Sequence, residues 1–585
     1  MSNGIFGALV NLNHSQTYLN WSFISISIAN LVVIATMVVI FGLALLLPFP
    51  KAKGTLPPEE EDATDHYPTD PRFKNMWTAR VRNFMLKVLP PHKLLPDRQP
   101  AYVASWIYVF GVATLAALGM VVLSGIVLAI GGLSWWHESS LGHFVNSMHL
   151  WSVELFMAFM VIHLWGKFWM AAWRGKRALT WITGGLAFGL SILESFTGYL
   201  SQQNFDSQWI ATNGKDAINA TGLGSFFNLT NFGQMISWHV ILLPIGLASF
   251  VLIHIALVRV RGVSHPIQKA HGRAERKALK EAEAAHWRGT TREYDIIKEG
   301  TIASLIVFLL VIGLSATLSS PDDPPVTVAS WSKTAPADFL ATTVSELAGT
   351  SETANYGPPY NNGSSNLQKL GVSWQMLGGV HQKINAAQTF VLAPLTSLAP
   401  GNTKLINALA QYNNASATQQ KAWDQAYLRA VTNVSFKSQQ PIVPKANDGP
   451  VPILAANELA FAQSGAIDTS LLSQQPFYGT NYTKPLLFIE DGSYFSSLAG
   501  AQHLKGNQWG VMNETGSYPG QPWLWLYTLW YQIPAFSHSP NVDLIAIYLT
   551  TLATALLLAV PFIPGIRDVP KLVPVHRLIW RSKKN

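Results

Sequence analysis

The sequence predicts an all-α integral membrane protein, with a four-helix bundle, further spans that bring the total to about seven, and an inserted domain outside the membrane. Of the 585 residues, 49% are hydrophobic and only 12% are charged, which is too few ionisable groups for a soluble protein of this size. The apolar residues also gather in windows of about 20, the length that crosses a bilayer core. A polar stretch of about two hundred residues, enough for a small domain, separates the last two windows.

The apolar windows and the basic stretches between them predict how the chain crosses the membrane. Lys and Arg are dense in residues 49–104 and 259–298, and basic loops stay on the cytoplasmic side. We therefore expect the N-terminus and the 320–518 segment outside, and the C-terminus in the cytoplasm. The seven predicted spans are 22–48, 105–133, 144–172, 180–200, 234–258, 300–319 and 541–563.

The absence of cysteine and the placement of charge exclude several functions. Without cysteine there are no disulfides, no thiolate metal ligands and no covalent haem attachment, so any metal chemistry depends on histidine. The net charge is +8, but the basic residues fall mainly in the loops between spans. This distribution does not predict nucleic-acid binding.

The 320–518 segment is rich in Ser, Asn, Gln, Gly and Pro, with helix-like pieces at 403–413 and 417–431. Its lone histidines, His381 and His503, are expected at the surface. Asn-x-Ser/Thr sequons fall only on the predicted outer side and predict a glycoprotein. They begin at Asn13, Asn20, Asn219, Asn228, Asn362, Asn414, Asn433, Asn481 and Asn513.

Two of the apolar windows each carry a pair of histidines. His149 and His163 are fourteen residues apart, and His239 and His254 are fifteen apart. Fourteen residues of helix rise about 21 Å and return to within about 40° of the starting face. On two antiparallel helices, His149 can therefore pair with His239 near the outside, and His163 with His254 near the inside.

Four imidazoles at two matched depths favour two stacked bis-histidine haem sites, which suit electron transfer. Intramembrane histidines also form interhelical hydrogen bonds or serve proton paths, so a non-redox transporter is the alternative. Glycines repeat the same interval: Gly111 and Gly125 on the preceding helix, Gly184 and Gly198 on the following one. Because glycine has no side chain, a flat macrocycle can approach the backbone there.

Residues 100–320 and 517–580 resemble the cytochrome b and cytochrome b6 family, the dihaem subunit of bc-type quinol:acceptor oxidoreductases, including an archaeal branch associated with quinol oxidases. The resemblance rests on four motifs: WITGGLAFGLSILESFTGYLSQQ, HVILLPIGLASFVLIHIALVRVRGVSHPI, YDIIKEG and YPGQPWLWLYTLWYQIP. It implies two haems, b-type or alternatively a-type, with a quinol-oxidising outer site and a quinone-reducing inner site. It also implies a Rieske iron-sulfur partner within a respiratory complex that contains an oxidase or a cytochrome c-type acceptor.

The resemblance also implies roles for individual residues. The four histidines become the metal ligands, and Arg259 joins the four glycines as a cofactor-binding residue. Lys298 and Glu299, in YDIIKEG, fall where family members place the inner quinone site.

The outer site departs from the family pattern. The family's Pro-Glu-Trp-Tyr element falls on residues 519–522, which read PGQP and lack the glutamate. Arginines expected near the haem propionates are replaced by Asn146 and Asn231.

A quinol oxidised at the outer face must still release protons to an acceptor. Acids within spans are functional candidates, and Glu194 is the predicted acceptor. Glu154 and Asp206 are weaker candidates, and an interhelical hydrogen bond is the alternative role for each acid.

Two redox functions follow. In the first, the chain transfers electrons from quinol through two haems to a Rieske-type partner, with transmembrane proton coupling. In the alternative, it is a structural and electron-relay subunit of a terminal quinol oxidase supercomplex with a degenerate outer site.

The predicted organisation is an outer tail (1–21), an extra span (22–48), a cytoplasmic linker (49–104), the dihaem core (105–259), a cytoplasmic loop (260–299), a fifth core span (300–319), the outer domain (320–518), and an outer-site-like segment with the sixth core span and tail (519–585).

Overall fold

The computed structural model describes most of the chain, and the gaps fall mainly near the N-terminus. Most of the predicted outer tail, part of the 49–104 linker and the sequons at Asn13 and Asn513 lie outside the described residues. The described residues are 10, 12, 17–50, 77–268, 272–285, 287–318, 320–437, 440–472, 479–505 and 516–580.

The described residues contain seven helices long and apolar enough to cross a membrane, as the sequence predicts. The first begins later than expected because residues 18–27 form a hairpin, and the Ser27 side chain caps the helix by accepting a hydrogen bond from the Asn30 amide. The spans are α1 (Ile28–Leu46), η2 and α4 (Trp106–Tyr108 and Val109–Gly131), α6 (Ser140–Trp169), α7 (Ala178–Leu200), α9, η4 and α10 (Phe232–Ser237, Trp238–Leu242 and Leu243–Arg261), α12 (Ile296–Leu318) and α26 (Val542–Ala559).

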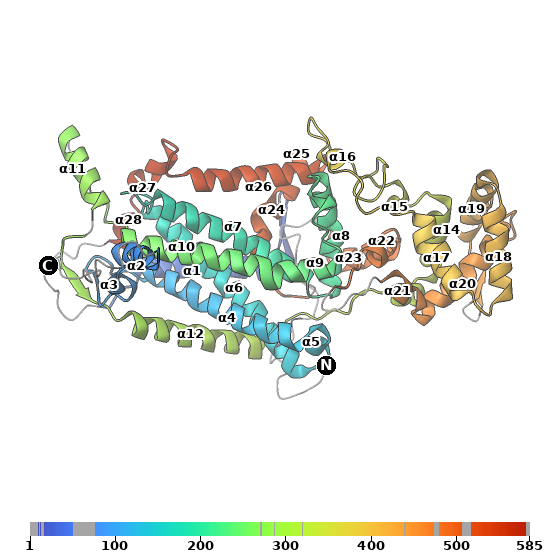
Figure 1. Ribbon diagram of the computed structural model, residues 1–585, viewed down its shortest axis with the longest axis horizontal. Helices are drawn as coiled ribbons and strands as arrows, with labels where there is room; N and C mark the ends of the chain where they lie inside the picture. The colour runs from blue at the N-terminus through green and yellow to red at the C-terminus, as the bar shows by residue number, and fades with distance from the viewer. Residues whose placement is uncertain are drawn as a thin grey trace.

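Helices α4, α6, α7 and α10 form the four-helix bundle (Figure 1). Helix α4 packs along α6, and α7 packs along α10. Helix α12 lies against α4 and α6, while α26 lies against α7 on the other side of the bundle. The predicted all-α membrane fold is therefore confirmed.

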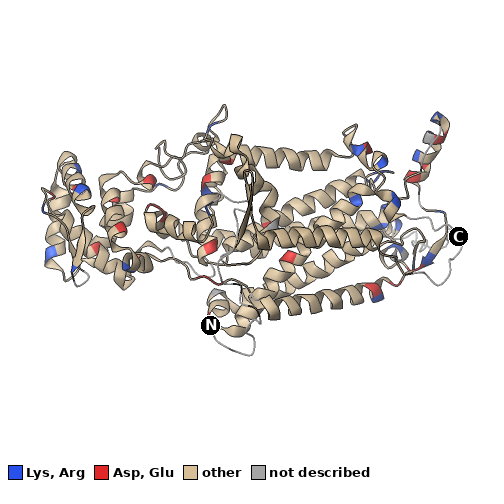
Figure 2. Cartoon of the chain, turned by 180° about the vertical axis from the view of Figure 1, so that it is seen from behind, with Lys and Arg blue, Asp and Glu red and all other residues tan. Residues whose placement is uncertain are grey.

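The two ends of the bundle differ in charge. Lys and Arg gather at the end near the C-terminus, which we call the basic end (Figure 2). Two short strands there, β3 (Arg98–Pro100) and β4 (Thr291–Glu293), pair antiparallel. The other elements of this end are α2 (Trp77–Val88), α3 (Pro91–Leu94), α11 (Arg273–Ala284), η8 (Ile566–Asp568), α27 (Val569–Leu572) and α28 (His576–Ile579).

The opposite end, which we call the domain end, continues into helices built from the 320–518 segment (Figure 1). These helices pack around a hydrophobic core, which Phe205 joins and in which the Trp331 and Phe339 rings lie 4.9 Å apart. The predicted helices at 403–413 and 417–431 are present as α18 and α19. The elements are α13 (Val328–Thr334), α14 (Pro336–Ala348), α15 (Glu352–Asn355), α16 (Trp374–Gly378), η5 (Ala387–Leu392), α17 (Ala393–Leu398), α18 (Thr403–Asn414), α19 (Ala417–Val431), β5 (Ser435–Lys437), β6 (Gln440–Ile442), α20 (Val451–Ser464), α21 (Ala466–Leu471), α22 (Thr483–Glu490) and α23 (Ser493–Ala501).

Short elements connect the bundle to these helices. They are β1 (Tyr18–Trp21), β2 (Ile24–Ser27), α5 (Leu133–Glu138), α8 (Phe205–Ala220), η3 (Leu223–Ser225), η6 (Pro522–Leu524), α24 (Trp525–Leu529), η7 (Trp530–Gln532) and α25 (Pro534–Ser537). His381 and His503 are exposed, as predicted. The sequons at Asn219 and Asn228 do not suit glycosylation, because both side chains are buried and hydrogen bonded.

A buried ion-pair cluster joins α8 to the domain end. The Lys215 ammonium lies 2.8 Å from the Glu490 carboxylate and 3.0 Å from that of Asp216, which also accepts a hydrogen bond from the Tyr356 hydroxyl. Burial alone lowers the pKa of Lys215, but the carboxylates of Asp216 and Glu490 together outweigh it and hold that pKa well above its ordinary value. The ion pair between Lys215 and Glu490 therefore ties α22 to α8.

Replacing Lys215 by Met should loosen the domain end, because it leaves two half-buried carboxylates without their buried cation. The expected cost is about 3–5 kcal/mol. Limited proteolysis of residues 320–505 measures it, and cleavage should be faster in the variant. Lys421→Met removes an exposed lysine of α19 and serves as the control. Equal cleavage of the two variants would contradict this role of Lys215.

Candidate functional site

Four histidines lie on two facing sides of the bundle. His149 and His163 belong to α6, His239 to η4 and His254 to α10. The rings of His149 and His239 have centroids 6.2 Å apart and planes at 89°. A metal that binds two opposed imidazoles at about 2 Å from each nitrogen puts the ring centroids about 6 Å apart. The pair at the domain end therefore has the separation of two ligands that share one metal.

The second pair lines a cavity at the basic end. His163 and His254 face a space of about 1500 Å³, together with Gly111 and Gly184. This volume exceeds the 300–1,000 Å³ of ordinary ligand pockets, so it accommodates a large planar cofactor. His163 and His254 thus face one common space, which the pairing expected from helical spacing requires.

Each histidine ring packs against one of the four glycines. A Cβ on Gly111 would lie 3.0 Å from the His163 ring, and one on Gly125 3.1 Å from the His149 ring. A Cβ on Gly184 would lie 3.0 Å from the His254 ring, and one on Gly198 2.8 Å from Nδ1 of His239. The imidazoles themselves fill the room that glycine leaves, whereas the spacing alone suggested a macrocycle in that place.

Three of the four imidazoles are held through Nδ1. Nδ1 lies 3.0 Å from the Ser124 hydroxyl in His149, 3.0 Å from the Glu194 carbonyl in His239, and 3.0 Å from the Thr180 carbonyl in His254. The Nδ1 atom of His163 is buried and has no hydrogen-bond partner among the described residues.

Those backbone carbonyls decide the tautomer of two histidines. A carbonyl oxygen only accepts hydrogen bonds, so Nδ1 of His239 and of His254 carries the hydrogen. Nε2 of each ring then keeps its lone pair, which is the arrangement that metal-ligating histidines adopt. The sequence could not reveal these partners, because Ser124, Glu194 and Thr180 belong to neighbouring helices.

A π-helical turn explains the unequal histidine spacing. Residues Trp238–Leu242 form η4, in which the Leu243 amide donates to the Trp238 carbonyl, one residue further back than in an α-helix. The turn takes up one extra residue, so His239 and His254 lie on one face despite their fifteen-residue interval. Pro244 lies two residues after the turn, at the start of α10.

The other predicted site residues lie in three different places. The Glu194 carboxylate lies 3.2 Å from Nδ1 of His239. Arg259 lines the basic-end cavity together with Lys167. Lys298 and Glu299 are exposed in the first turn of α12 and do not line that cavity.

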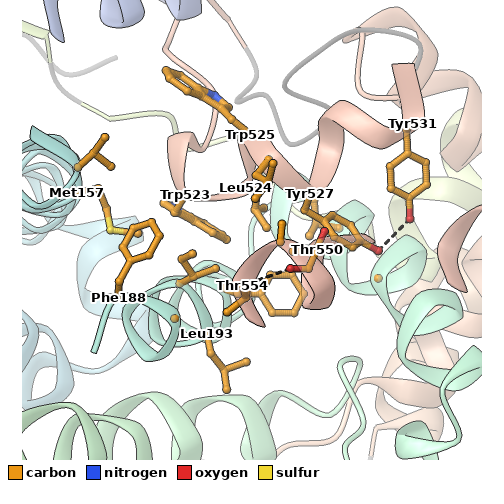
Figure 3. A pocket seen from close by; sticks show the side chains of 18 of the residues that line it. Met157, Phe188, Leu193, Trp523, Leu524, Trp525, Tyr527, Tyr531, Thr550 and Thr554 are labelled. Atoms are coloured by element: carbon orange, nitrogen blue, oxygen red, sulfur yellow. Dashed lines mark hydrogen bonds between the residues drawn. The ribbon is translucent and has the colours of Figure 1, made fainter. Parts of the chain in front are cut away.

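A second cavity, of about 1080 Å³, lies at the domain end (Figure 3). Aromatic and apolar side chains such as Phe188, Leu193 and Trp523 form its walls, and Tyr527 and Tyr531 lie at one side. We call it the domain-end cavity. It includes the residues that resemble the family's outer site.

Of the three acids expected at the outer site, one lines this cavity. Glu154 lines it, whereas Glu194 and Asp206 do not. The Gly520 amide, at the position of the missing glutamate, donates a 2.7 Å hydrogen bond to the Asn30 side chain of α1. Helix α1 therefore supports the segment that departs from the family pattern.

The fold and the histidines define a membrane-spanning helical bundle that carries four imidazoles, each packed against a glycine. A family described as cytochrome b (N-terminal)/b6/petB matches residues 154–325, which include three of the four histidines. The resemblance to the cytochrome b family is therefore confirmed, and it implies haem as the cofactor.

Individual cytochrome b and cytochrome b6 proteins are also similar to this chain. Cytochrome b6 of Heliomicrobium gestii is 28% identical over 142 residues, 22% of this chain and 67% of that protein. Cytochrome b of Schizosaccharomyces japonicus is 28% identical over 209 residues, 32% of this chain and 53% of that one. The cytochrome bc complex cytochrome b subunit of Chlorobaculum thiosulfatiphilum is 31% identical over 141 residues, 22% of this chain and 33% of that one. The match to a solved structure titled hyperthermophilic respiratory Complex III covers 67% of this chain and 96% of that one, at 16% identity and with a TM-score of 0.30.

Replacing Gly111 by Ala should lower the haem content of the basic-end pair, because the new methyl group displaces the His163 ring. Gly119→Ala, on the same helix, is the control, since a Cβ there meets nothing within 4 Å. Both variants gain up to about 1 kcal/mol of helix propensity, so only the steric effect differs. The haem-to-protein ratio of the purified variants measures the effect. Equal ratios in the two variants would show that the glycine is not needed there.

Proposed function

We propose that this chain transfers electrons from quinol through two haems, each held between two histidines, within a respiratory membrane complex. A Rieske-type iron-sulfur protein and an oxidase or cytochrome c-type acceptor are the proposed partners. The observation that carries the proposal is the set of four imidazoles, paired across the bundle and each packed against a glycine. When bound, bis-histidine haem accepts and passes on single electrons without an open coordination position.

The chain's own side chains hold and orient the cofactors in this proposal. The Nδ1 hydrogen bonds fix the planes of three imidazoles and direct Nε2 across the bundle. At the basic end, Arg259 and Lys167 supply positive charge to the cavity of His163 and His254. Cations in that position suit the carboxylates of a haem or the oxygen atoms of a quinone.

The quinone sites follow from the cavities and the charges. The domain-end cavity has the apolar, aromatic walls that suit a quinol ring. We place the outer reaction there, and the inner reaction at the basic end near Lys298 and Glu299. With the basic end in the cytoplasm, the N-terminus and the 320–518 domain lie outside, and quinol oxidation outside with quinone reduction inside moves protons across the membrane.

A relay role within a terminal quinol oxidase is the second candidate. It is favoured by one observation, the loss of the acid at Gly520, whose amide is instead bonded to Asn30. In that role the chain holds its haems, b-type or a-type, but does not oxidise quinol itself. Haem reduction by added quinol in the purified complex separates the two candidates. Reduction of the haems supports quinol oxidation by this chain, and its absence supports the relay role.

Replacing His239 by Leu should remove the haem at the domain end and leave the one at the basic end, because Leu cannot ligate iron. Reduced-minus-oxidised spectra of the purified complex measure which haem is lost, and its quinol oxidation rate should fall with it. His381→Leu, at an exposed histidine, is the control. Loss of only the basic-end haem would contradict the proposed pairing.

Replacing Glu194 by Gln should slow quinol oxidation if Glu194 accepts a proton, while both haems remain bound. The amide keeps a hydrogen-bonding oxygen near His239 but cannot take up a proton at working pH. Stopped-flow reduction of the haems by quinol measures the rate. An unchanged rate with an altered haem potential would instead assign Glu194 to the orientation of His239.

A further inference from the structure

A chain of hydrogen bonds runs from the domain-end cavity to the start of α26. The hydroxyls of Tyr527 and Tyr531 lie 2.9 Å apart (Figure 3), and the Tyr531 hydroxyl donates a 2.5 Å hydrogen bond to the Asp543 carboxylate. All three side chains line the cavity. A continuous polar path therefore leaves a space whose other walls are largely apolar.

The direction of the hydrogen bonds follows from the chemistry of the groups. An ionised carboxylate accepts hydrogen bonds but cannot donate them. The Tyr531 hydroxyl therefore donates its hydrogen to Asp543. The hydrogen between the two tyrosines must then come from Tyr527. The Tyr527 oxygen is left with acceptor capacity toward the cavity, where a hydroxyl of a bound molecule can donate to it.

The 320–518 segment holds Asp543 in place. The Gln368 amide donates to the second oxygen of Asp543, and the Gln368 oxygen accepts a 3.2 Å hydrogen bond from the Leu544 amide. The Lys369 amide binds the Asn541 side chain at 2.7 Å. Asp543 lies in the first turn of α26, three residues after the exposed Pro540, so a proton that reaches it is close to the surface.

We infer that Asp543, reached through Tyr531 and Tyr527, accepts a proton from quinol in the domain-end cavity and so replaces the glutamate missing at Gly520. This inference rests on the proposed quinol oxidation. Two other acids line this cavity. Asp216 is paired with Lys215, and Glu154 of α6 has no comparable path of hydrogen bonds toward the domain end among the described residues.

The proton transfer balances as follows. The quinol O–H bond breaks and its proton moves to Tyr527, while Tyr527 passes its own proton to Tyr531 and Tyr531 passes one to the Asp543 carboxylate. Both tyrosines are unchanged at the end, and Asp543 becomes a carboxylic acid. In its complete oxidation to quinone, the quinol gives one electron to the Rieske-type iron-sulfur protein and one to a haem. The second proton follows the same path once Asp543 has released the first one to water.

Asp543→Asn in the purified complex tests the inference, with decylubiquinol or menadiol as the electron donor. The amide can keep hydrogen bonds to Gln368 and Tyr531 but cannot accept the proton. We expect kcat to fall about tenfold or more, with KM changed less than about twofold. The fall of kcat at acid pH, which reports protonation of the acceptor, should flatten in the variant.

Two further variants keep the result interpretable. Tyr531→Phe interrupts the path and should lower kcat as well, whereas Asp543→Glu should restore most of it. Tyr548→Phe is the control: it also removes one phenol hydroxyl, but Tyr548 is an exposed residue of α26 and does not line the cavity.

An unchanged kcat in Asp543→Asn, or a lowered kcat with an unaltered pH profile, would overturn the inference while leaving the proposed function intact. If neither donor reduces the haems of the unaltered complex, the proposed function fails and the inference fails with it.

Discussion

The close packing of four imidazoles against four glycines is the constraint on which the rest of the bundle depends. Each histidine reaches across to a glycine of the adjacent helix, α4 for the α6 histidines and α7 for those of η4 and α10. A larger residue at any of these glycines would push a ring out of position. The helices must therefore keep a fixed separation and register, and the Nδ1 hydrogen bonds then set the orientation of each ring.

The two ends of the bundle use different chemistry around the same histidine arrangement. The basic end offers a large cavity with cationic side chains such as Lys167 and Arg259. The domain end offers an apolar, aromatic cavity that carries acids and phenols at its edges. Residues far along the chain complete this second cavity, and the ion pairs of Lys215 and the contacts of Gln368 attach the 320–518 segment beside it.

The sequence predicts much of this arrangement because the membrane restricts the choices. A bilayer requires apolar runs of about 20 residues, so the seven spans are visible without a structure. Helical periodicity places His149 and His163 on one face, and a matching interval on a second helix predicts the pairing.

Other features depend on contacts that no local pattern records. The π-turn at His239 reconciles the fifteen-residue interval with a single face, yet its sequence resembles any apolar helix. The Gln368 contact to Asp543 joins residues 175 positions apart. The interval of the glycines predicts a close approach at these positions, but only the structure shows that the neighbouring group is the imidazole.

The most direct test of the central claim is the haem content of the purified, unaltered chain, measured by reduced-minus-oxidised spectra and by haem quantified per polypeptide. The paired histidines predict two low-spin haems for each chain, with band positions that identify b-type or a-type haem. A single haem, or none, would contradict the account of four imidazoles as two pairs of ligands.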